Sequence, residues 1–363
     1  MARCYYRVLN STPLTIGRVV VFLSLALIFV ISTSGCREVP VDRLYALQLD
    51  HVPSSEDWRS AMPRLVTVRG GFENIPPRLG DIDEDIVHTS TASCHHGAAL
   101  PDPVHVDMRA FYTDQELFIR LSWDDPTRDD RFRQWRYDGE VWVAQAGFED
   151  GFGLMWDAQS SFPGFTCSYA CHIEDFGVSG ANFHARNRMR LARADSLVDF
   201  WNWKAARTAR SGFVDDRYLT VEKIVADVPG EIFYPNSVLA QSGAEPFTEG
   251  DAPLYDSEGK LIDAEFRLSG TVAPGFLTER PIAGRADIKA ISSYADGRWT
   301  VVLQRALDTG DKKDVVFVPG DEAGVAFGLS IMDNTLDQHY ASSTEERLVL
   351  LADTTLLDGS MKE

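Results

Sequence analysis

Basic residues are scarce in this sequence compared with acidic ones. The 363-residue chain contains 35 lysine and arginine residues and 54 aspartate and glutamate residues, so its formal net charge is −19. Nucleic acids and anionic lipids present negative phosphates, which such a surface repels. The charge balance therefore argues against nucleic acid and against an anionic membrane surface as partners, and it is compatible with a basic protein partner.

Several other patterns are missing. The sequence has no internal repeat and no low-complexity tract. It has no Ser/His/Asp order and no paired-carboxylate motif that would require a hydrolase. Helical periodicity is weak and is confined to the region of 196–210. These absences favour a non-catalytic protein that is built mainly from strands.

One long apolar run lies near the N-terminus, over 19–31. The 35 residues before Cys36 carry three arginines and no acidic residue. A basic start, an apolar centre too short for a comfortable membrane span and a small-residue exit are typical of a secretory signal. Its removal takes three positive charges from the chain and changes the net charge from −19 to −22.

The residues "ISTSGC" (31–36) resemble the lipobox of bacterial lipoproteins, in which the cysteine is acylated and becomes the new N-terminus. Thr33 departs from the leucine that is usual three residues before the cysteine, so cleavage without lipid stays open. In both cases we expect the mature chain outside the cytoplasm, on the periplasmic side of a bacterial membrane. A lipid at Cys36 would anchor it to that membrane, and the outer membrane is one candidate location. Disulfides and covalent haem attachment can both form there.

Alternating apolar and polar residues predict a sheet with one buried face. In "VHVDMRAFY" (104–112) every second residue from the first is apolar, and "LFIRLSW" (117–123) repeats the alternation after the polar turn "TDQE". We expect these segments to form a hairpin. Further short strand candidates are punctuated by glycine or aspartate: 139–148, 151–157, 297–307, 314–318, 325–333 and 346–353. Such recurrence predicts a mainly β fold, a single β-sandwich with long loops and a few short helices.

The predicted organisation has three parts. The signal occupies 1–35, an N-terminal linker with entry strands occupies 36–99, and one sandwich domain occupies 100–355. Within that domain, 228–277 is rich in proline, glycine and aspartate. It reads as a long ordered excursion rather than as a separate domain.

The segment "FTCSYACHIEDF" (165–176) carries the strongest chemical signal. A Cys167–Cys171 disulfide is the simplest interpretation, but residues four apart on a helix have Cβ atoms about 5–6 Å apart, whereas a disulfide needs about 3.5–4.5 Å. A loop would permit the bond, so this interpretation stays open. A zinc site would need a second close pair of ligands, and only Cys94-His95-His96 offers one. A thioredoxin-like pair would have two intervening residues, not three.

Covalent haem is the remaining interpretation. In c-type attachment two thiols bind the haem vinyl groups, and the histidine after the second cysteine binds the iron. The familiar form has two residues between the cysteines, whereas three stand between Cys167 and Cys171. The order of functions is nevertheless intact, with His172 in place as an iron ligand.

Other segments resemble a known family. They are "LSWDDPT" (121–127), "FTCSYACH" (165–172), "DFWNWKAARTARSGFVDDRYL" (199–219), "GRADIKAISSYADGRWTVVLQRALDTGDKKDVVF" (284–317) and "FGLSIMDNTLDQHY" (327–340). They resemble the extracytoplasmic haem-binding proteins related to the haem subunit of ethylbenzene dehydrogenase and similar molybdoenzymes. The resemblance spans about 100 to 351. "STASCHHG" is not part of the family pattern.

The resemblance implies a β-sandwich of the cytochrome type, akin to carbohydrate-binding domains, that holds one haem at one end. It implies a first iron ligand near Cys171 and His172 and a second in the C-terminal region around His339. In subunits of the molybdoenzyme type these ligands are a methionine and a lysine. Here both places offer histidine, so we expect His172 and His339 as the axial pair.

Rival second ligands and pocket residues complete the prediction. The rival ligands are His95, His96, Met155, His184 and Met189, while His51, His88 and His105 are expected to be ordinary surface or loop histidines. Trp201 and Trp203 could line the haem edge with Lys204 or Arg207 near a propionate, or they could pack as core. The pairs Asp124–Asp125 and Asp215–Asp216 could bind calcium or cap turns.

Two strong axial ligands leave no open position on the iron, so the chemistry reduces to one-electron exchange. We therefore expect a c-type cytochrome that passes electrons between a membrane quinol oxidoreductase or molybdoenzyme and another carrier. One alternative is a haem-free carbohydrate-binding lipoprotein in which Trp201 and Trp203 stack on a sugar. Another is the haem subunit of a molybdenum oxidoreductase complex.

Overall fold

A computed structural model describes residues 43–69, 102–162, 164–173, 189–191, 196–221, 223–262, 268–334, 340–342 and 344–352. For 168–169, 171–173 and 189–190 it describes the backbone alone. Within these ranges no helix has both the length and the apolar character needed to span a membrane. The predicted signal, Cys36, Cys94 and the histidines 88, 95, 96, 184 and 339 lie outside the described residues.

Most strands join one large sheet. Its strands are β1 (Arg43–Gln48), β2 (Arg64–Arg69), β3 (Val104–Tyr112), β4 (Glu116–Asp124), β7 (Gly151–Asp157), β10 (Val198–Lys204), β11 (Asp215–Leu219), β12 (Ile224–Ala226), β16 (Lys289–Ala295), β17 (Arg298–Ala306), β18 (Val325–Met332), β19 (Tyr340–Ser342) and β20 (Glu346–Leu351). They follow the order β12-β11-β10-β7-β18-β19-β2-β3-β4-β17-β16, while β1 pairs with β20 and β3, and β20 also pairs with β18.

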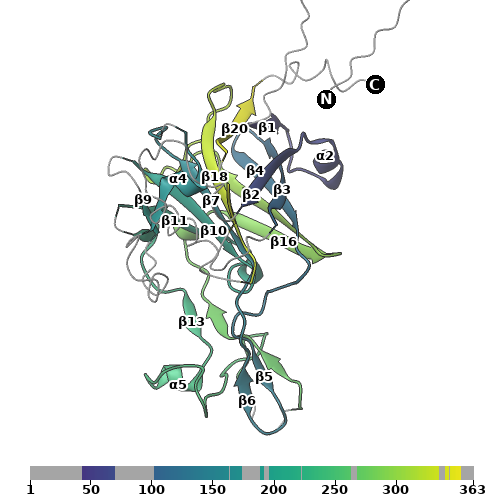
Figure 1. Cartoon of the computed structure of the whole chain (residues 1–363), viewed down its shortest axis with the longest axis vertical. Helices are drawn as coiled ribbons and strands as arrows, with labels where there is room; N and C mark the ends of the chain where they lie inside the picture. Colours follow the sequence, from purple (N-terminus) through teal and green to yellow (C-terminus); the bar gives the residue numbers. More distant parts are fainter. Residues whose placement is uncertain are drawn as a thin grey trace, which may run out of the picture. The chain divides into compact units, whose positions relative to one another are not determined.

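This sheet folds over itself into a β-sandwich. One layer runs from β12 to β18 and the other from β2 to β16, and β19, β20 and β1 join them along one side (Figure 1). The indole of Trp123 on β4 meets that of Trp203 on β10 with ring centroids 6.2 Å apart, which shows that the layers pack face to face. The predicted mainly β sandwich is confirmed.

The predicted hairpin is also confirmed. β3 pairs antiparallel with β4, and Met108 lies opposite Leu121. The residues predicted to face inward on these two strands are buried, apart from Val104 at the start of β3, which is half-buried. The opposite face is buried in part as well, because Phe111 and Phe118 pack against Trp58 of α2 (Ser55–Ser60).

Two local predictions are wrong. The weak helical signal over 196–210 corresponds to β10 followed by a short 3-10 helix, η2 (Ala209–Ser211), because pairing with β7 and β11 overrides the local propensity. The predicted strand 314–318 forms no ladder. There the backbone N–H of Val315 donates instead to the carboxylate of Asp199, at 3.0 Å.

The proline-rich excursion contains short strands outside the main sheet. β13 (Phe233–Pro235) pairs with β15 (Phe276–Thr278), and β14 (Val272–Ala273) pairs with β5 (Trp135–Tyr137), which pairs with β6 (Trp142–Ala144). The described residues there also contain α5 (Val238–Gln241). The buried Asn236 amide holds the excursion together, since its nitrogen donates to the carbonyls of Tyr255 and Pro274.

The core between the layers depends on large aromatic rings. Trp203 contacts Phe152 on β7 as well as Trp123 and Trp299 on the opposite layer. We expect Trp203→Ala to lower the free energy of unfolding by about 3–5 kcal/mol, because the substitution leaves a cavity among these rings. Urea denaturation would measure the change.

Ile282→Ala is the control, because Ile282 is 89% exposed and its truncation should change stability by less than about 0.5 kcal/mol. A loss below about 1 kcal/mol for Trp203→Ala would contradict this view of the core.

Candidate functional site

Cys167 lies at the start of a short helix on the outer face of the sandwich. The helix, α4 (Cys167–Ala170), packs against β18 and β19. The helix is followed directly by β8 (Cys171–Ile173), which pairs antiparallel with β9 (Met189–Leu191). Cys171 and His172 are the first two residues of β8, and their strand partners are Leu191 and Arg190.

Cys167 and Cys171 do not lie on one continuous helix. The expected Cβ separation of about 5–6 Å applies to residues four apart on one helix. The helix ends at Ala170, before Cys171. The helical spacing therefore does not govern the distance between the two cysteines.

A glycine fixes how closely α4 approaches the sheet. A Cβ built on Gly328 of β18 would lie 2.7 Å from the Cα of Cys167 and closer still to its backbone nitrogen. Only a residue without a side chain permits this approach. The start of the Cys-x3-Cys-His segment is thereby seated directly on β18.

The surroundings of Cys167 are apolar. Cys167 belongs to a buried outer cluster, which we define by its members: Met155, Phe162, Phe165, Cys167, Ala170, Leu191, Val198, Phe200, Leu219, Ala326 and Ala341. Met155 projects to this outer face because its neighbours Leu154 and Trp156 face the core. The cluster is apolar, and the Cys167 thiol and the Met155 thioether are groups of the kinds that hold haem in proteins, so the chemistry of the residues present fits that group.

Of the rival iron ligands, Met155 is thus in the same cluster as Cys167. The side chains of His172 and Met189, and all of His339, His184, His95 and His96, fall outside what the structure describes. His51 and His105 are ordinary surface histidines, as predicted: the first contacts Asp50 and Asp57, and the second contacts Thr67.

Trp201 and Trp203 do not share a face with the outer cluster. They alternate with Val198, Phe200 and Asn202 along β10, so they point into the core while Val198 and Phe200 point toward α4. Both indoles are at most 1% exposed. The structure therefore places them in the core-packing role and not beside Cys167.

Lys204 forms a buried ion pair with Asp215. Its Nζ lies 2.9 Å from a carboxylate oxygen of Asp215, and the guanidinium of Arg285 lies 2.6 Å from the other. Burial alone would raise the pKa of Asp215, but these cations outweigh it and hold the pKa at about 2. Two cations already compensate Asp215, so this residue needs no calcium.

The adjacent aspartate pairs are split by strand geometry. Asp124 is exposed and pairs with Arg298, whereas Asp125 is buried. In the same way Asp215 forms the ion pairs above, whereas Asp216 points to the other face of β11 and into the core. One oxygen of Asp125 caps a turn, because the N–H of Thr127 donates to its Oδ1 at 3.0 Å.

Asp216 lies in a buried carboxylate cluster that the sequence pattern did not reveal. Its carboxylate, with those of Asp199 and Asp314, places oxygens within 4.8 Å of one another. Arg305 is the central cation, with its guanidinium 3.0 Å from Asp314 and 3.7 Å from Asp199. A usable signal was Asp199 itself, because an acidic residue on the same strand face as Trp201 indicates a buried polar partner.

Comparison with known proteins shows the family of the chain. A model of the family described as ethylbenzene dehydrogenase matches residues 56–340, which is most of the chain. The chain belongs to the ethylbenzene dehydrogenase family. This family member has no match among curated proteins.

Several solved structures are similar to this member of the ethylbenzene dehydrogenase family. One is a family 9 carbohydrate-binding module from Caldicellulosiruptor kristjanssonii in complex with cellotriose, with 6% identity, a TM-score of 0.34 and coverage of 88% of this chain and 98% of that one. Another is a putative carbohydrate-binding protein from Bacteroides uniformis, with 9% identity, a TM-score of 0.32 and coverage of 85% and 99%. Such distant similarity says nothing of what this chain binds.

The seat of α4 on the sheet can be tested. We expect Gly328→Ala to destabilise the protein by about 1–3 kcal/mol, because the added methyl group overlaps the backbone of Cys167. Urea denaturation would measure the loss. Gly284→Ala is the matched control, since a Cβ there makes only ordinary contacts at 3.8 Å; equal effects of the two substitutions would contradict the close approach.

The buried carboxylates predict a pH dependence of stability. Burial, followed by the carboxylates of Asp199 and Asp287, raises the pKa of Asp216 well above its ordinary value. A carboxyl group whose folded pKa is raised binds its proton more tightly when folded, so stability falls as the pH rises from about 4 toward the folded pKa. We expect the wild-type protein to lose stability between about pH 5 and pH 8 for this reason.

Asp216→Asn should make that loss smaller, because an amide side chain has no proton to release as the pH rises. Urea denaturation at both pH values, in the presence of a chelator, would measure it. The exposed Asp296→Asn is the control and should leave the pH dependence unchanged. An unchanged dependence in Asp216→Asn would show that this carboxyl is not the group responsible.

Proposed function

We propose that this member of the ethylbenzene dehydrogenase family is an extracytoplasmic haem protein, a c-type cytochrome that carries single electrons. The observation that carries the proposal is the position of the Cys-x3-Cys-His segment: Cys167 lies in the apolar outer cluster, and Cys171 and His172 follow directly in β8. Family membership over 56–340 supports it. The protein itself then has no catalytic role.

The haem, when bound, supplies a one-electron iron couple. The chain's own residues would hold it: Cys167 and Cys171 by thioether bonds and His172 on the iron. The apolar outer cluster would exclude water from the macrocycle, which influences the reduction potential. His339 is proposed as the second ligand, with Met155 as its strongest described rival because Met155 shares the cluster with Cys167.

Burial of Trp201 and Trp203 argues against a carbohydrate-binding function in which these two residues stack on a sugar. A sugar platform needs an exposed ring face, whereas Trp201 and Trp203 are enclosed between the layers. These two residues therefore cannot stack on a sugar without unfolding the core.

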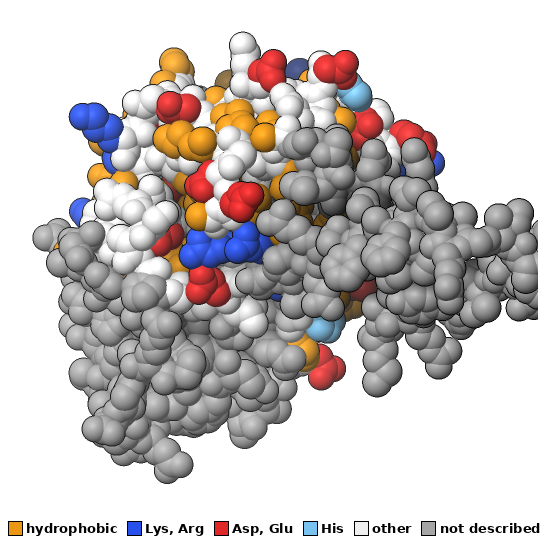
Figure 2. Space-filling model, turned by 90° about the horizontal axis from the view of Figure 1, so that it is seen from above, with side chains coloured by type: hydrophobic (Ala, Val, Ile, Leu, Met, Phe, Trp, Pro, Cys, Tyr) orange, Lys and Arg blue, Asp and Glu red, His pale blue; other side chains and the backbone are white. Residues whose placement is uncertain are grey.

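Partners are proposed from charge and compartment. The chain has a formal charge of −19, which favours encounter with a basic redox protein and makes that encounter sensitive to salt. On the face shown in Figure 2, acidic side chains are interspersed with basic and apolar ones and do not form one continuous patch. We propose that a lipid on Cys36 holds the chain at a periplasmic membrane surface, where a quinol oxidoreductase or a molybdoenzyme exchanges electrons with it.

Haem staining after denaturing electrophoresis tests the proposal. The full chain, produced in a host with a c-type maturation system, should keep its haem through denaturation. Cys167→Ala and Cys171→Ala should each weaken or abolish this staining, because each removes one of the two thioether bonds. Cys94→Ala is the matched control and should retain it, since Cys94 lies outside the segment.

A colourless wild-type protein whose Cys167 and Cys171 form a disulfide would refute the electron-carrier function. If haem is present, the spin state of His339→Ala and of Met155→Leu identifies the second ligand. The variant that changes a low-spin spectrum into a high-spin one has lost it.

A further inference from the structure

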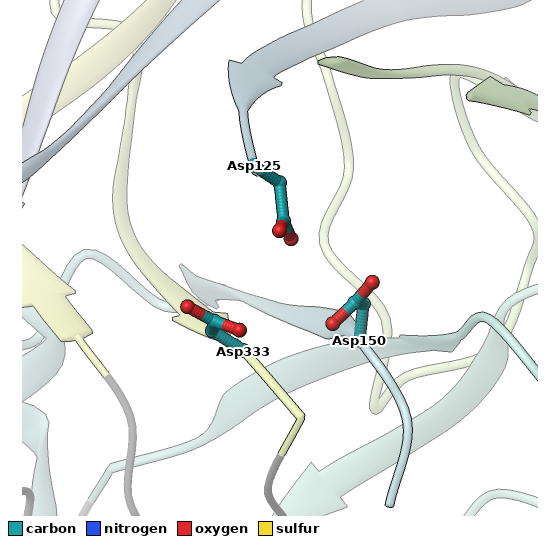
Figure 3. A group of neighbouring side chains, drawn as sticks. All are labelled: Asp125, Asp150 and Asp333. Atoms are coloured by element: carbon teal, nitrogen blue, oxygen red, sulfur yellow. The ribbon is translucent and has the colours of Figure 1, made fainter. Parts of the chain in front are cut away.

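Three aspartates from distant parts of the chain converge at one end of the sandwich. Asp125 follows β4, Asp150 precedes β7, and Asp333 follows β18. Figure 3 shows their carboxylates directed toward a common space. Each contributes an oxygen to a group in which all these atoms lie within 4.8 Å of one another.

Asp125 supplies the observation that points to a ligand. Asp125 is only 3% exposed, and its Oδ2 is buried and accepts no hydrogen bond from the residues that the structure describes. The other oxygen is occupied by the N–H of Thr127. A buried carboxylate oxygen without a donor has lost its hydration without compensation, which is costly unless a cation or a proton is present.

Asp150 is held rigidly beside it. The residue is completely buried, and its Oδ2 accepts from the N–H of Asp129 and from Nε1 of Trp299, both at 2.8 Å. Its Oδ1 accepts from the N–H of Asn334 at 3.1 Å. Neutral donors orient this carboxylate but do not cancel its charge. Both lone pairs of Oδ2 are used, whereas Oδ1 accepts one hydrogen bond and keeps a lone pair for a further ligand.

Among the residues that the structure describes, the positive side chains near this group pair with other acids. Within the described parts of the chain, none of the three aspartates forms an ion pair with lysine or arginine. The nearby arginines are engaged by other acids, Arg128 by Asp130 and Arg298 by Asp124. The contrast is the cluster around Asp216, where Arg305 already supplies a central positive charge.

We propose that Asp125, Asp150 and Asp333 form a binding site for a divalent cation, calcium. The ligand set is all oxygen, which hard cations prefer. Calcium binds oxygens at about 2.3–2.6 Å, so its ligands can lie up to roughly 4.6–5.2 Å apart, which matches the observed spacing. The exposed Asp333 opens the site to solvent, and water supplies the remaining ligands.

Such an ion would join the two layers of the sandwich. Asp125 belongs to the layer that contains β4, whereas Asp150 and Asp333 belong to the layer that contains β7 and β18. A ligand that binds only the folded state stabilises it by mass action. Calcium is thus a structural ion here, and its binding does not depend on the proposed haem function.

Calorimetric titration of the chelator-treated full chain with CaCl2, with thermal unfolding in parallel, tests the site. We expect binding of one calcium ion per chain at these residues and a rise in Tm of at least about 4 °C at a concentration of about 100 times Kd. Asp125→Asn and, separately, Asp333→Asn should weaken binding at least about tenfold, because each removes a charged ligand. The exposed neighbour Asp124→Asn is the matched control and should change Kd less than about twofold.

Each other outcome overturns the proposal. Absence of calcium binding by the wild-type protein refutes the site outright. Binding that survives both Asp125→Asn and Asp333→Asn but is lost in Asp216→Asn would move the ion to the cluster around Arg305. Tighter binding of MgCl2 than of CaCl2 would replace calcium as the ion. Since Asp333 is exposed, Asp333→Asn keeps the test valid if Asp125→Asn fails to fold.

Discussion

The packing of aromatic rings between the two layers is the interaction on which the rest of the molecule depends. Trp123 and Trp299 from one layer meet Phe152 and Trp203 from the other. Because strand residues alternate between faces, this inward set fixes what the same strands present outward. The outer cluster that surrounds Cys167 is therefore the reverse side of the core, and a residue cannot serve both faces.

The alternation of strand faces also explains why the two residues of each adjacent aspartate pair have different surroundings. Adjacent aspartates on a strand or at its end point in opposite directions, so one member of each pair meets a cation and the other enters a buried carboxylate group. Asp215 and Asp124 are compensated by basic side chains, while Asp216 and Asp125 meet other acids. Buried carboxylates of this kind are stable only with protons, with an arginine such as Arg305 or with a bound cation.

Sequence reasoning was effective where the signal was local. Alternation over 104–123 predicted the hairpin, and the motifs quoted from 121 to 340 predicted the family. It was ineffective where contacts with distant segments override the local pattern. Within 196–210 the strand β10 forms because β7 and β11 pair with it, and 314–318 forms no ladder although its residues favour strands.

The sequence by itself determined the sandwich class, the family and the order of chemical groups in Cys-x3-Cys-His, because periodicity and motif spacing are properties of consecutive residues. Only the tertiary structure decided that Trp201 and Trp203 are core residues and that Met155 is a neighbour of Cys167. It alone brought Asp125, Asp150 and Asp333 together. These contacts join residues that are far apart in the chain, and no local pattern records which strand faces will meet.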